Sequence, residues 1–219
     1  MVERTGKTTK AELGFIHYFM PAAEKGDKMV TLLLLHGTGG NEQDLIPLGR
    51  EIYPNAAILS PRGKVLEGGM PRFFRRLAEG VFDIEDLKFR THELADFVQK
   101  ASRVYAFDLK NVISIGYSNG ANIASSLLLL RPEVLSSAVL FRAMVPLMPQ
   151  KIPNLASKNI FMAAGDHDPI VRREQTEMLH RMFEKGGANV VLHWQKNAGH
   201  QLGYDEISAA REWLSRLSI

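Results

Sequence analysis

Cysteine is the first absence in this 219-residue sequence. A chain without cysteine cannot form disulfide bonds, use a thiolate nucleophile or bind zinc through cysteine ligands. The same absence is compatible with any cellular compartment, so it does not locate the protein.

Long apolar runs are missing as well, and none approaches the roughly 18 residues that a membrane-spanning helix needs. The first residues, Met1 to Lys7, are polar and are not followed by an apolar core, which is unlike a secretory signal peptide. We therefore expect a cytoplasmic protein, with residues 1–12 forming a flexible N-terminal extension.

A strong charge of one sign is the third absence. Lys and Arg total 27 against 24 Asp and Glu, a formal net charge of +3, and the basic residues are spread along the chain. This distribution does not indicate a nucleic-acid partner. Hydrophobic residues make up 45% of the sequence and charged residues 23%, as in ordinary globular proteins, and the length suits a single domain over residues 1–219.

Short apolar runs alternate with segments of helical character along the chain. Several of the runs are continuously apolar, as in strands that are buried on both faces. We expect strands over residues 14–20, 29–35, 56–60, 111–115, 135–141, 159–164 and 188–194, and helices over residues 41–51, 84–106, 121–130, 171–185 and 203–218. This order predicts an α/β fold with a mostly parallel central sheet and helices on both faces. Ligands of such sheets bind beyond the carboxyl ends of the strands.

The sequence Gly-Tyr-Ser-Asn-Gly at residues 116–120 lies between a predicted strand and a predicted helix. Gly-x-Ser-x-Gly in this context is typical of a nucleophile elbow, a sharp turn that exposes the serine hydroxyl. The glycines are expected because the strand and helix backbones nearly touch and leave no room for a Cβ. We therefore predict Ser118 as a nucleophile, with the positive end of the helix dipole beneath it.

A serine hydroxyl is a weak nucleophile that needs a base to accept its proton and an acid to orient that base. In the α/β-hydrolase arrangement the chain order is Ser, then Asp or Glu, then His. We predict His200 as the base because it follows the last strand, whereas His180 lies within a helix and His193 within a strand. We predict Asp168 as the acid in preference to Asp166, because the chain must turn after the strand before an acid can point back at the histidine.

A tetrahedral intermediate carries an oxyanion that needs hydrogen-bond donors already in place. One expected donor is the backbone N–H that follows the nucleophile, that of Asn119. The other is expected from the glycine-rich loop at residues 36–40, and we predict the Thr38 N–H. We interpret His36, which begins this loop, as structural.

Four motifs occur in a characteristic order and spacing: LHGTGG at residues 35–40, GYSNG at 116–120, Gly-x-x-Asp-Pro-Ile-Val at 165–171, and Gly199-His200. Together they resemble the phospholipase/carboxylesterase family from about residue 14 onward. The resemblance implies the minimal α/β-hydrolase fold without a large lid domain, and the same triad and oxyanion donors. Tyr117 and Asn119 stand where the thioesterase members commonly have Phe and Gln, so the chain is more similar to the bacterial carboxylesterase branch.

Aromatic residues alternate with arginines in the segment 70–76. We predict that Phe73 and Phe74 line an acyl or aryl pocket. We predict that Arg72 or Arg75 meets an anionic group of the substrate. The alternative is a solvated basic loop with the phenylalanines packed beneath it.

Met144 begins an apolar segment, residues 144–148, after the strand expected at 135–141. We predict this segment either as a wall of the pocket or as a surface for a partner. A homodimer is compatible with the sequence, through an apolar edge strand or helix.

These motifs predict a serine hydrolase that cleaves carboxylic esters of small or medium chain length through an acyl-enzyme on Ser118. One alternative is a thioesterase or lysophospholipase that acts on longer acyl chains, and another is a non-catalytic ligand-binding protein on a hydrolase fold. A dienelactone hydrolase activity is disfavoured because that chemistry typically uses a cysteine. We expect no cofactor and no metal, since His167, between two aspartates, has no second well-placed histidine.

Overall fold

The computed structural model describes residues 7–9, 13–22 and 29–217. Its helices are α1 (Ile46–Ile52), α2 (Ile84–Tyr105), α3 (Asn119–Leu130), α4 (Arg173–Lys185) and α5 (Tyr204–Ser215). Its main strands are β1 (Lys7–Thr9), β2 (His17–Met20), β3 (Thr31–Leu35), β4 (Ala57–Pro61), β9 (Val112–Tyr117), β10 (Ser137–Phe141), β11 (Asn159–Gly165) and β12 (Asn189–Gln195). Each helix and strand expected from the sequence is present, with its ends shifted by a few residues.

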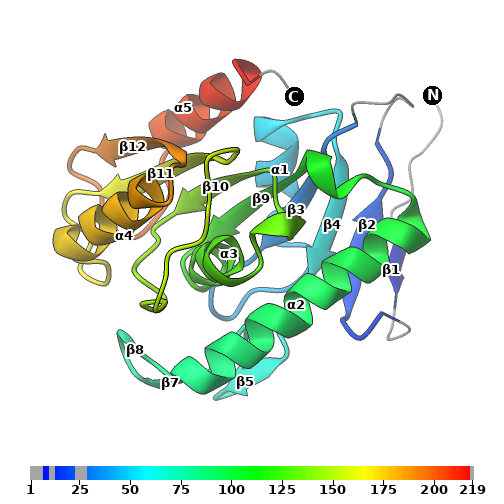
Figure 1. The fold of residues 1–219 in the computed structure, drawn as a ribbon, viewed down its shortest axis with the longest axis horizontal. Coiled ribbons are helices and arrows are strands. Elements are labelled where there is room, and N and C mark those ends of the chain that lie inside the picture. The colour runs from blue at the N-terminus through cyan, green and yellow to red at the C-terminus, as the bar shows by residue number, and fades with distance from the viewer. Residues whose placement is uncertain (1–6, 10–12, 23–28, 218–219) are drawn as a thin grey trace.

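The eight main strands form one sheet in the order β1-β2-β4-β3-β9-β10-β11-β12 (Figure 1). The six strands β4, β3, β9, β10, β11 and β12 run parallel to one another. β2 runs antiparallel to β4, and β1 runs antiparallel to β2. The predicted mostly parallel sheet is confirmed.

Alternate side chains of each strand point to opposite faces of the sheet, and each face carries its own core. Leu33 and Leu35 of β3 pack into the core beneath α2, α3 and α4, the face toward the viewer in Figure 1. Leu32 and Leu34 pack into the core formed with α1 and α5. All four leucines are fully buried, and each contributes roughly 1.5–3 kcal/mol to folding. Helices therefore cover both faces, as predicted.

Residues 62–83, for which no helix or strand is predicted above, include two hairpins outside the main sheet. The first pairs β5 (Val65–Glu67) with β6 (Met70–Arg72), and the second pairs β7 (Arg76–Ala78) with β8 (Val81–Phe82). Both hairpins lie beside the amino-terminal end of α2 (Figure 1).

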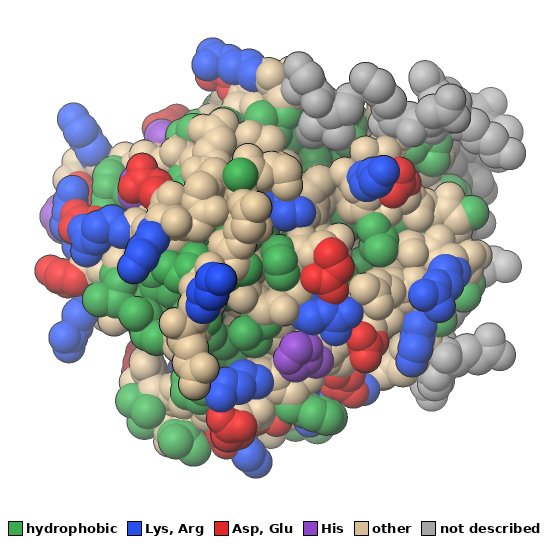
Figure 2. Space-filling view, viewed as in Figure 1, with side chains coloured by type: hydrophobic (Ala, Val, Ile, Leu, Met, Phe, Trp, Pro, Cys, Tyr) green, Lys and Arg blue, Asp and Glu red, His purple; other side chains and the backbone are tan. Residues whose placement is uncertain are grey.

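Residues 1–6 and 10–12 of the predicted flexible extension lie outside the described residues. The three residues between them differ from that prediction, because Lys7–Thr9 pair with β2 as an edge strand. In the described part of the chain, no helix combines the length and the apolar character needed to cross a membrane. Basic and acidic side chains are interspersed on the face shown in Figure 2.

The first turn of α3 crosses very close to the carboxyl end of β3. A Cβ added at Gly120 would lie 1.8 Å from the Leu35 carbonyl oxygen, and one at Gly116 would lie 2.7 Å from the Gly120 carbonyl oxygen. These atoms belong to rigid backbone at the centre of the fold, so they cannot move aside without disturbing β3. Both glycines of the predicted elbow are therefore required by space.

This crossing gives a prediction about stability. Gly120→Ala should lower the free energy of unfolding, measured by urea denaturation, by about 3 kcal/mol or more because the added methyl overpacks the crossing. The matched control is Gly199→Ala, where the nearest atom to an added Cβ is 3.9 Å away. The control should change stability by less than about 1 kcal/mol. Equal unfolding midpoints for the two variants would contradict the steric account.

Candidate active site

Ser118 occupies the sharp turn between β9 and α3. Its backbone has φ 52° and ψ −113°, in the left-handed half of φ/ψ space that residues other than glycine rarely adopt. Such a conformation costs roughly 1–3 kcal/mol and persists only where the surroundings impose it. Here the Ser118 N–H donates to the Phe141 carbonyl at 2.9 Å, and the Ser118 carbonyl accepts from the Asn122 N–H at 2.9 Å. The predicted strand, elbow and helix are thus present at residues 112–130.

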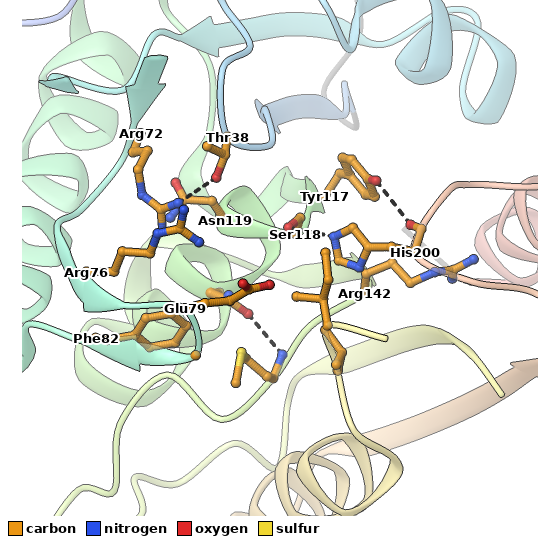
Figure 3. Close-up of a pocket in the computed structure, with 15 residues that line it drawn as sticks. Thr38, Arg72, Arg76, Glu79, Phe82, Tyr117, Ser118, Asn119, Arg142 and His200 are labelled. Carbon is orange, nitrogen blue, oxygen red and sulfur yellow. Dashed lines mark hydrogen bonds between the residues drawn. The ribbon is translucent and has the colours of Figure 1, made fainter. Parts of the chain in front are cut away.

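The structure brings Ser118, His200 and Asp168 together at the carboxyl ends of three strands, β9, β12 and β11. Figure 3 shows Ser118 beside His200. His200 Nε2 lies 2.9 Å from Ser118 Oγ, and His200 Nδ1 lies 2.8 Å from Asp168 Oδ2. With the imidazole proton on Nδ1, His200 donates to the carboxylate and presents Nε2 as an acceptor to the serine hydroxyl. This is the arrangement that base-assisted attack by a serine requires.

The surroundings of Asp168 favour its ionised form. Its side chain is 1% exposed, and burial alone would raise the pKa of this carboxyl group. Hydrogen bonds from His200 and from the backbone N–H groups of Val171 and Ile170 outweigh that effect and lower the pKa below its ordinary value. Asp166 accepts a 3.3 Å bond from the Ala198 N–H, which ties two loops together, so the preference for Asp168 agrees with the geometry.

Two backbone N–H groups are available beside Ser118. Asn119 is the first residue of α3, where a helix leaves its N–H groups without intrahelical acceptors. The Thr38 N–H donates to no acceptor in the part of the chain that the structure describes. Both residues line the cavity at Ser118, as predicted for oxyanion donors.

The loop that carries Thr38 is held in place from two sides. The buried His36 ring accepts from the Gly63 N–H through Nε2 at 2.9 Å, and burial lowers its pKa. From the hairpin, Arg72 Nη1 donates to Thr38 Oγ1 at 2.7 Å, and the Pro71 carbonyl accepts from the Gly39 N–H at 2.9 Å. The interpretation of His36 as structural fits these contacts.

A cavity of about 220 Å³ lies over Ser118 (Figure 3). Apolar side chains line part of it: Phe82, Tyr117, Met144, Ile170 and Val171. Polar side chains line the rest, among them Thr38, Arg72, Arg76, Glu79, Asn119 and Asn122. The cavity therefore has a wall that includes Met144, which is one of the two alternatives predicted for that residue.

The prediction that Phe73 and Phe74 line the pocket is wrong. Both are buried in the core beneath the hairpins, with 2% and 0% of their surface exposed, and neither reaches the cavity. The Phe73 ring lies 4.7 Å from that of His36, and the Phe74 ring lies 4.9 Å from that of Phe82. Phe82 of the second hairpin supplies the aromatic wall, because Phe74 packs underneath and supports it.

Arg72 lines the cavity as predicted, but Arg75 does not. The Arg75 side chain is 60% exposed and pairs with Asp83 at 2.7 Å, outside the cavity. Arg76 lines the cavity instead and donates from Nε to Glu67 at 2.8 Å. Side chains alternate between the two sides of an extended chain, so Arg75, just before β7, and Arg76, its first residue, point in opposite directions.

Three residues that sequence analysis missed surround the loop carrying His200. Arg142 and Glu206 have fully buried side chains and form a bidentate ion pair, with Nη1–Oε2 at 2.5 Å and Nη2–Oε1 at 2.7 Å. The Tyr117 hydroxyl donates to the His200 carbonyl at 3.0 Å. An arginine after an apolar strand gives no sign of burial in a sequence, because arginines are mostly exposed.

Among the described residues, no group of three or more His, Cys, Asp or Glu side chains is arranged to hold a metal ion. The three consecutive residues Asp166, His167 and Asp168 do not form such a group, because their side chains have different partners. Asp168 contacts His200, whereas His167 is exposed and lies 3.8 Å from Asp166.

Comparison with known proteins identifies the family. The dienelactone hydrolase family matches residues 77–218, well over half of the chain. The chain belongs to the dienelactone hydrolase family. Its candidate nucleophile is nonetheless Ser118, in a sequence that has no cysteine.

Relatives extend the match to nearly the whole chain. MhqD of Bacillus subtilis (strain 168), described as a candidate hydrolase, is 50% identical over 190 residues, which cover 87% of this chain and 94% of MhqD. The Bacillus cereus carboxylesterase is 50% identical with a TM-score of 0.89, over 92% of this chain and 94% of that structure. YahD, solved with malic acid, is 32% identical with a TM-score of 0.83, over 90% and 96%. The α/β-hydrolase fold without a large lid domain, and the resemblance to small bacterial carboxylesterases, are confirmed.

The lowered pKa of Asp168 predicts a pH-dependent contribution to stability. The folded pKa lies below the ordinary value near 3.9, so the ionised carboxylate stabilises the fold above about pH 4, and this stabilisation is lost as pH falls through the folded pKa. Asp168→Asn should therefore be less stable than the wild type at pH 7. The difference between their free energies of unfolding, measured by urea denaturation, should shrink as pH falls from about 5 to 3.

Asp166→Asn provides the control, because it removes a carboxylate from the same loop. Among the described residues this carboxylate accepts a long hydrogen bond from the Ala198 N–H at 3.3 Å and lies 3.8 Å from the exposed His167 ring. This substitution should change stability at pH 7 by less than about 0.5 kcal/mol. A stability difference between wild type and Asp168→Asn that stays constant down to pH 3 would count against the described electrostatics.

Proposed function

We propose that this protein is a serine esterase that cleaves carboxylic esters of small or medium chain length. The observation that carries the proposal is the pair of hydrogen bonds through which His200 connects Ser118 to Asp168, within a cavity that could hold an ester. Membership of a hydrolase family and 50% identity to the Bacillus cereus carboxylesterase support it.

In the proposed reaction the Ser118 hydroxyl gives its proton to His200 Nε2 while its oxygen attacks the ester carbonyl carbon. The carbonyl oxygen becomes an oxyanion that accepts hydrogen bonds from the Thr38 and Asn119 N–H groups. When the intermediate collapses, the bond to the alcohol breaks and His200 returns the proton to the departing oxygen. A water molecule then attacks the acyl-enzyme with the same proton transfers, which releases the acid and restores Ser118.

Asp168 acts through His200 in this scheme. Its carboxylate holds the imidazole in the orientation and tautomer that leave Nε2 free to accept a proton, and it stabilises the imidazolium that forms. The carboxylate is suited to this role because its backbone hydrogen bonds from Ile170 and Val171 keep it ionised.

The dimensions of the cavity favour short acyl groups over the long chains of thioesterase or lysophospholipase substrates. Its volume of about 220 Å³ lies below the roughly 300–1,000 Å³ typical of sites for drug-sized ligands. On the side of Met144 and Ile170 the cavity adjoins a hollow whose lining includes the polar side chains of Glu79, Arg172 and Gln175. A long apolar chain that continued into this hollow would lie against charged groups.

The alternative of a non-catalytic binding protein has less support. A protein that only binds does not need a serine in a strained backbone conformation at hydrogen-bond distance from a histidine. It also does not need a buried carboxylate aimed at the other ring nitrogen of that histidine.

The test uses p-nitrophenyl esters of graded acyl chain length. The wild type should hydrolyse the short-chain esters best, and Ser118→Ala should lower kcat by about a thousandfold or more because the nucleophile is lost. Labelling by a fluorophosphonate probe should disappear in the same variant. Turnover that survives in Ser118→Ala, or a wild type that neither turns over nor takes up the probe, would refute the proposal.

We further propose that one end of the cavity receives an anionic or acceptor-rich part of the substrate. The guanidinium groups of Arg72 and Arg76 lie side by side across Ser118 from His200 (Figure 3). Burial, and then the charge of Arg76, lower the pKa of Arg72, and Glu67 offsets this only in part. Beside them, the buried Nδ2 of Asn119 has no hydrogen-bond partner in the described part of the chain. Arg72 and Arg76 thus bring two positive charges to this end of the cavity, against the carboxylate of Glu67, which pairs with both, and that of Glu79, which lines the cavity. YahD was solved with malic acid, a dicarboxylic acid.

The adjacent residues Arg76 and Arg75 allow a matched test of this proposal, because one lines the cavity and the other does not. Arg76→Gln should lower kcat/KM for mono-p-nitrophenyl succinate about tenfold while changing it less than threefold for the neutral acetate, because one charge-assisted contact is lost. Arg75→Gln removes the same charge from the adjacent, exposed residue and should change neither value more than about twofold. Equal losses on both esters in Arg76→Gln would contradict an anion-binding role.

A further inference from the structure

Arg142 combines two features that each carry a free-energy cost. Its side chain is fully buried, and its backbone φ of 58° lies in the left-handed region that arginine rarely adopts. Removing a guanidinium from water is expensive unless each of its N–H groups finds a partner, and a strained φ adds roughly 1–3 kcal/mol. Arg142 follows β10 directly and lines the cavity at Ser118.

The guanidinium of Arg142 contacts α5 and the loop that carries His200, and Nη1 also donates a longer bond of 3.4 Å to the Ala163 carbonyl of β11. Nε donates to the Gly199 carbonyl at 2.9 Å, and Nη2 donates to the Gln201 carbonyl at 2.7 Å. These two carbonyls belong to the residues on either side of His200. Nη1 and Nη2 also donate to the two oxygens of Glu206, at 2.5 and 2.7 Å.

Glu206 connects these hydrogen bonds to the end of the loop. It lies in the first turn of α5, and its Oε1 accepts from the Gly203 N–H at 2.6 Å. A carboxylate is favoured at a helix N-terminus, which is where Glu206 pairs with the guanidinium. Arg142 and Glu206 together fasten the chain at residues 199, 201 and 203, which leaves the loop little freedom to move.

The catalytic groups lie directly against this arrangement. The carbonyl of His200 itself accepts from the Tyr117 hydroxyl, so three successive carbonyls, those of residues 199, 200 and 201, are fixed by hydrogen bonds. Arg142 Nε also lies 3.8 Å from Asp168 Oδ2, the oxygen that contacts His200. The same guanidinium therefore touches the backbone around the base and approaches the acid that orients it.

A contribution to folding stability does not by itself explain why Arg142 and Glu206 are buried as an ion pair. Replacing a buried ion pair by apolar side chains of similar size is often neutral or stabilising, so an ion pair in this position is not needed to hold a fold together. The planar guanidinium fork offers something that an apolar side chain cannot, since it fixes several acceptors in one plane at defined angles. The acceptors that it fixes are those on both sides of His200.

We propose that Arg142 is a positioning residue for His200: with Glu206 it fixes the backbone on both sides of the base so that the imidazole bridges Ser118 and Asp168. The inference rests on the proposed function, because it concerns the residue assigned there as the base. It predicts that loosening Arg142 lowers kcat while substrate binding is retained.

The first test compares Arg142→Lys with the wild type on p-nitrophenyl acetate. Lysine keeps the charge, but its compact ammonium group cannot hold two carbonyls and a carboxylate in one plane. We expect kcat to fall about 10- to 100-fold, as displacements near 1 Å in an active site produce, with KM changed less than about threefold. The control is Arg131→Lys, at a partly exposed arginine that pairs with Asp96 and Glu133, and its kcat should stay within about twofold.

The second test asks whether Arg142 acts through His200. His200→Ala should retain a weak activity, because serine hydrolases that lose a triad member still accelerate hydrolysis by roughly 10³- to 10⁴-fold over water. If Arg142 serves to position His200, adding Arg142→Lys to His200→Ala should cause no further loss. If the Arg142→Lys effect persists undiminished in that background, Arg142 acts by a general structural route and the proposal is overturned.

A third variant separates the loss of positioning from a loss of folding. The double variant Arg142→Met, Glu206→Leu replaces the ion pair by apolar side chains of similar size, and its Tm should remain within a few degrees of the wild type. It should nevertheless lose at least as much kcat as Arg142→Lys, because the carbonyls beside His200 lose their donors. Wild-type kcat in this folded double variant would overturn the proposal.

The two proposals fail in distinguishable ways. Absence of Ser118-dependent turnover in the wild type would overturn the proposed function and this inference with it. An active, Ser118-dependent enzyme in which Arg142→Lys retains wild-type kcat would overturn the role of Arg142 alone.

Discussion

The close approach of α3 to the carboxyl end of β3 is the constraint on which the rest of the site depends. Glycine is required at residues 116 and 120 because backbone atoms occupy the space of a side chain. The crossing forces the chain to reverse within a single residue, and Ser118 takes the strained conformation that results. It also brings the start of α3 beside the loop that leaves β3, so the N–H groups of Asn119 and Thr38 reach the same cavity.

A buried network of hydrogen bonds fixes the part of the site that the α3–β3 crossing does not reach. Ser118 is fixed by rigid backbone, but His200 lies in a loop between β12 and α5, which has no regular secondary structure to hold it. Hydrogen bonds supply the missing rigidity, from Arg142 and Tyr117 to the loop carbonyls and from backbone N–H groups to Asp168. Ser118 is therefore held by backbone packing, whereas His200 and Asp168 are held by hydrogen bonds.

The part of the site that local sequence signals specify could be predicted. Continuous apolar runs predicted the strands of the sheet, and the glycines around Ser118 predicted the elbow. The order of the strands predicted that Asp168 and His200 lie near Ser118. These features depend on neighbouring residues and on topology, which a sequence shows. The assignments of Phe73 and Phe74 failed, since an aromatic residue near a site packs equally well above or beneath a hairpin. The choice between Arg75 and Arg76 turned on the phase of a three-residue strand, which composition does not determine.

The role of Arg142 could not be predicted for a different reason. Its partners beside His200 and at Glu206 lie 57 to 64 residues away along the chain, and no local pattern marks them. An arginine and a glutamate are ordinary surface residues in any sequence. Only their meeting in three dimensions shows that both are buried and that the loop between them carries His200.

The two hairpins differ in how firmly they are joined to the candidate active site, and this difference bears on how the site can evolve. The β5–β6 hairpin and the residues after it are tied to the elbow by the bond from the Phe73 N–H to Asn119 Oδ1, and to the Thr38 loop through Arg72 and Pro71. Changes there would disturb recognition and chemistry at once. The β7–β8 hairpin contributes Arg76, Glu79 and Phe82 to the cavity, yet no hydrogen bond from it to the elbow or the Thr38 loop is found among the described residues. Libraries that vary residues 77–82 would thus explore new substrates while leaving the reaction centre in place, and natural divergence has the same route open to it.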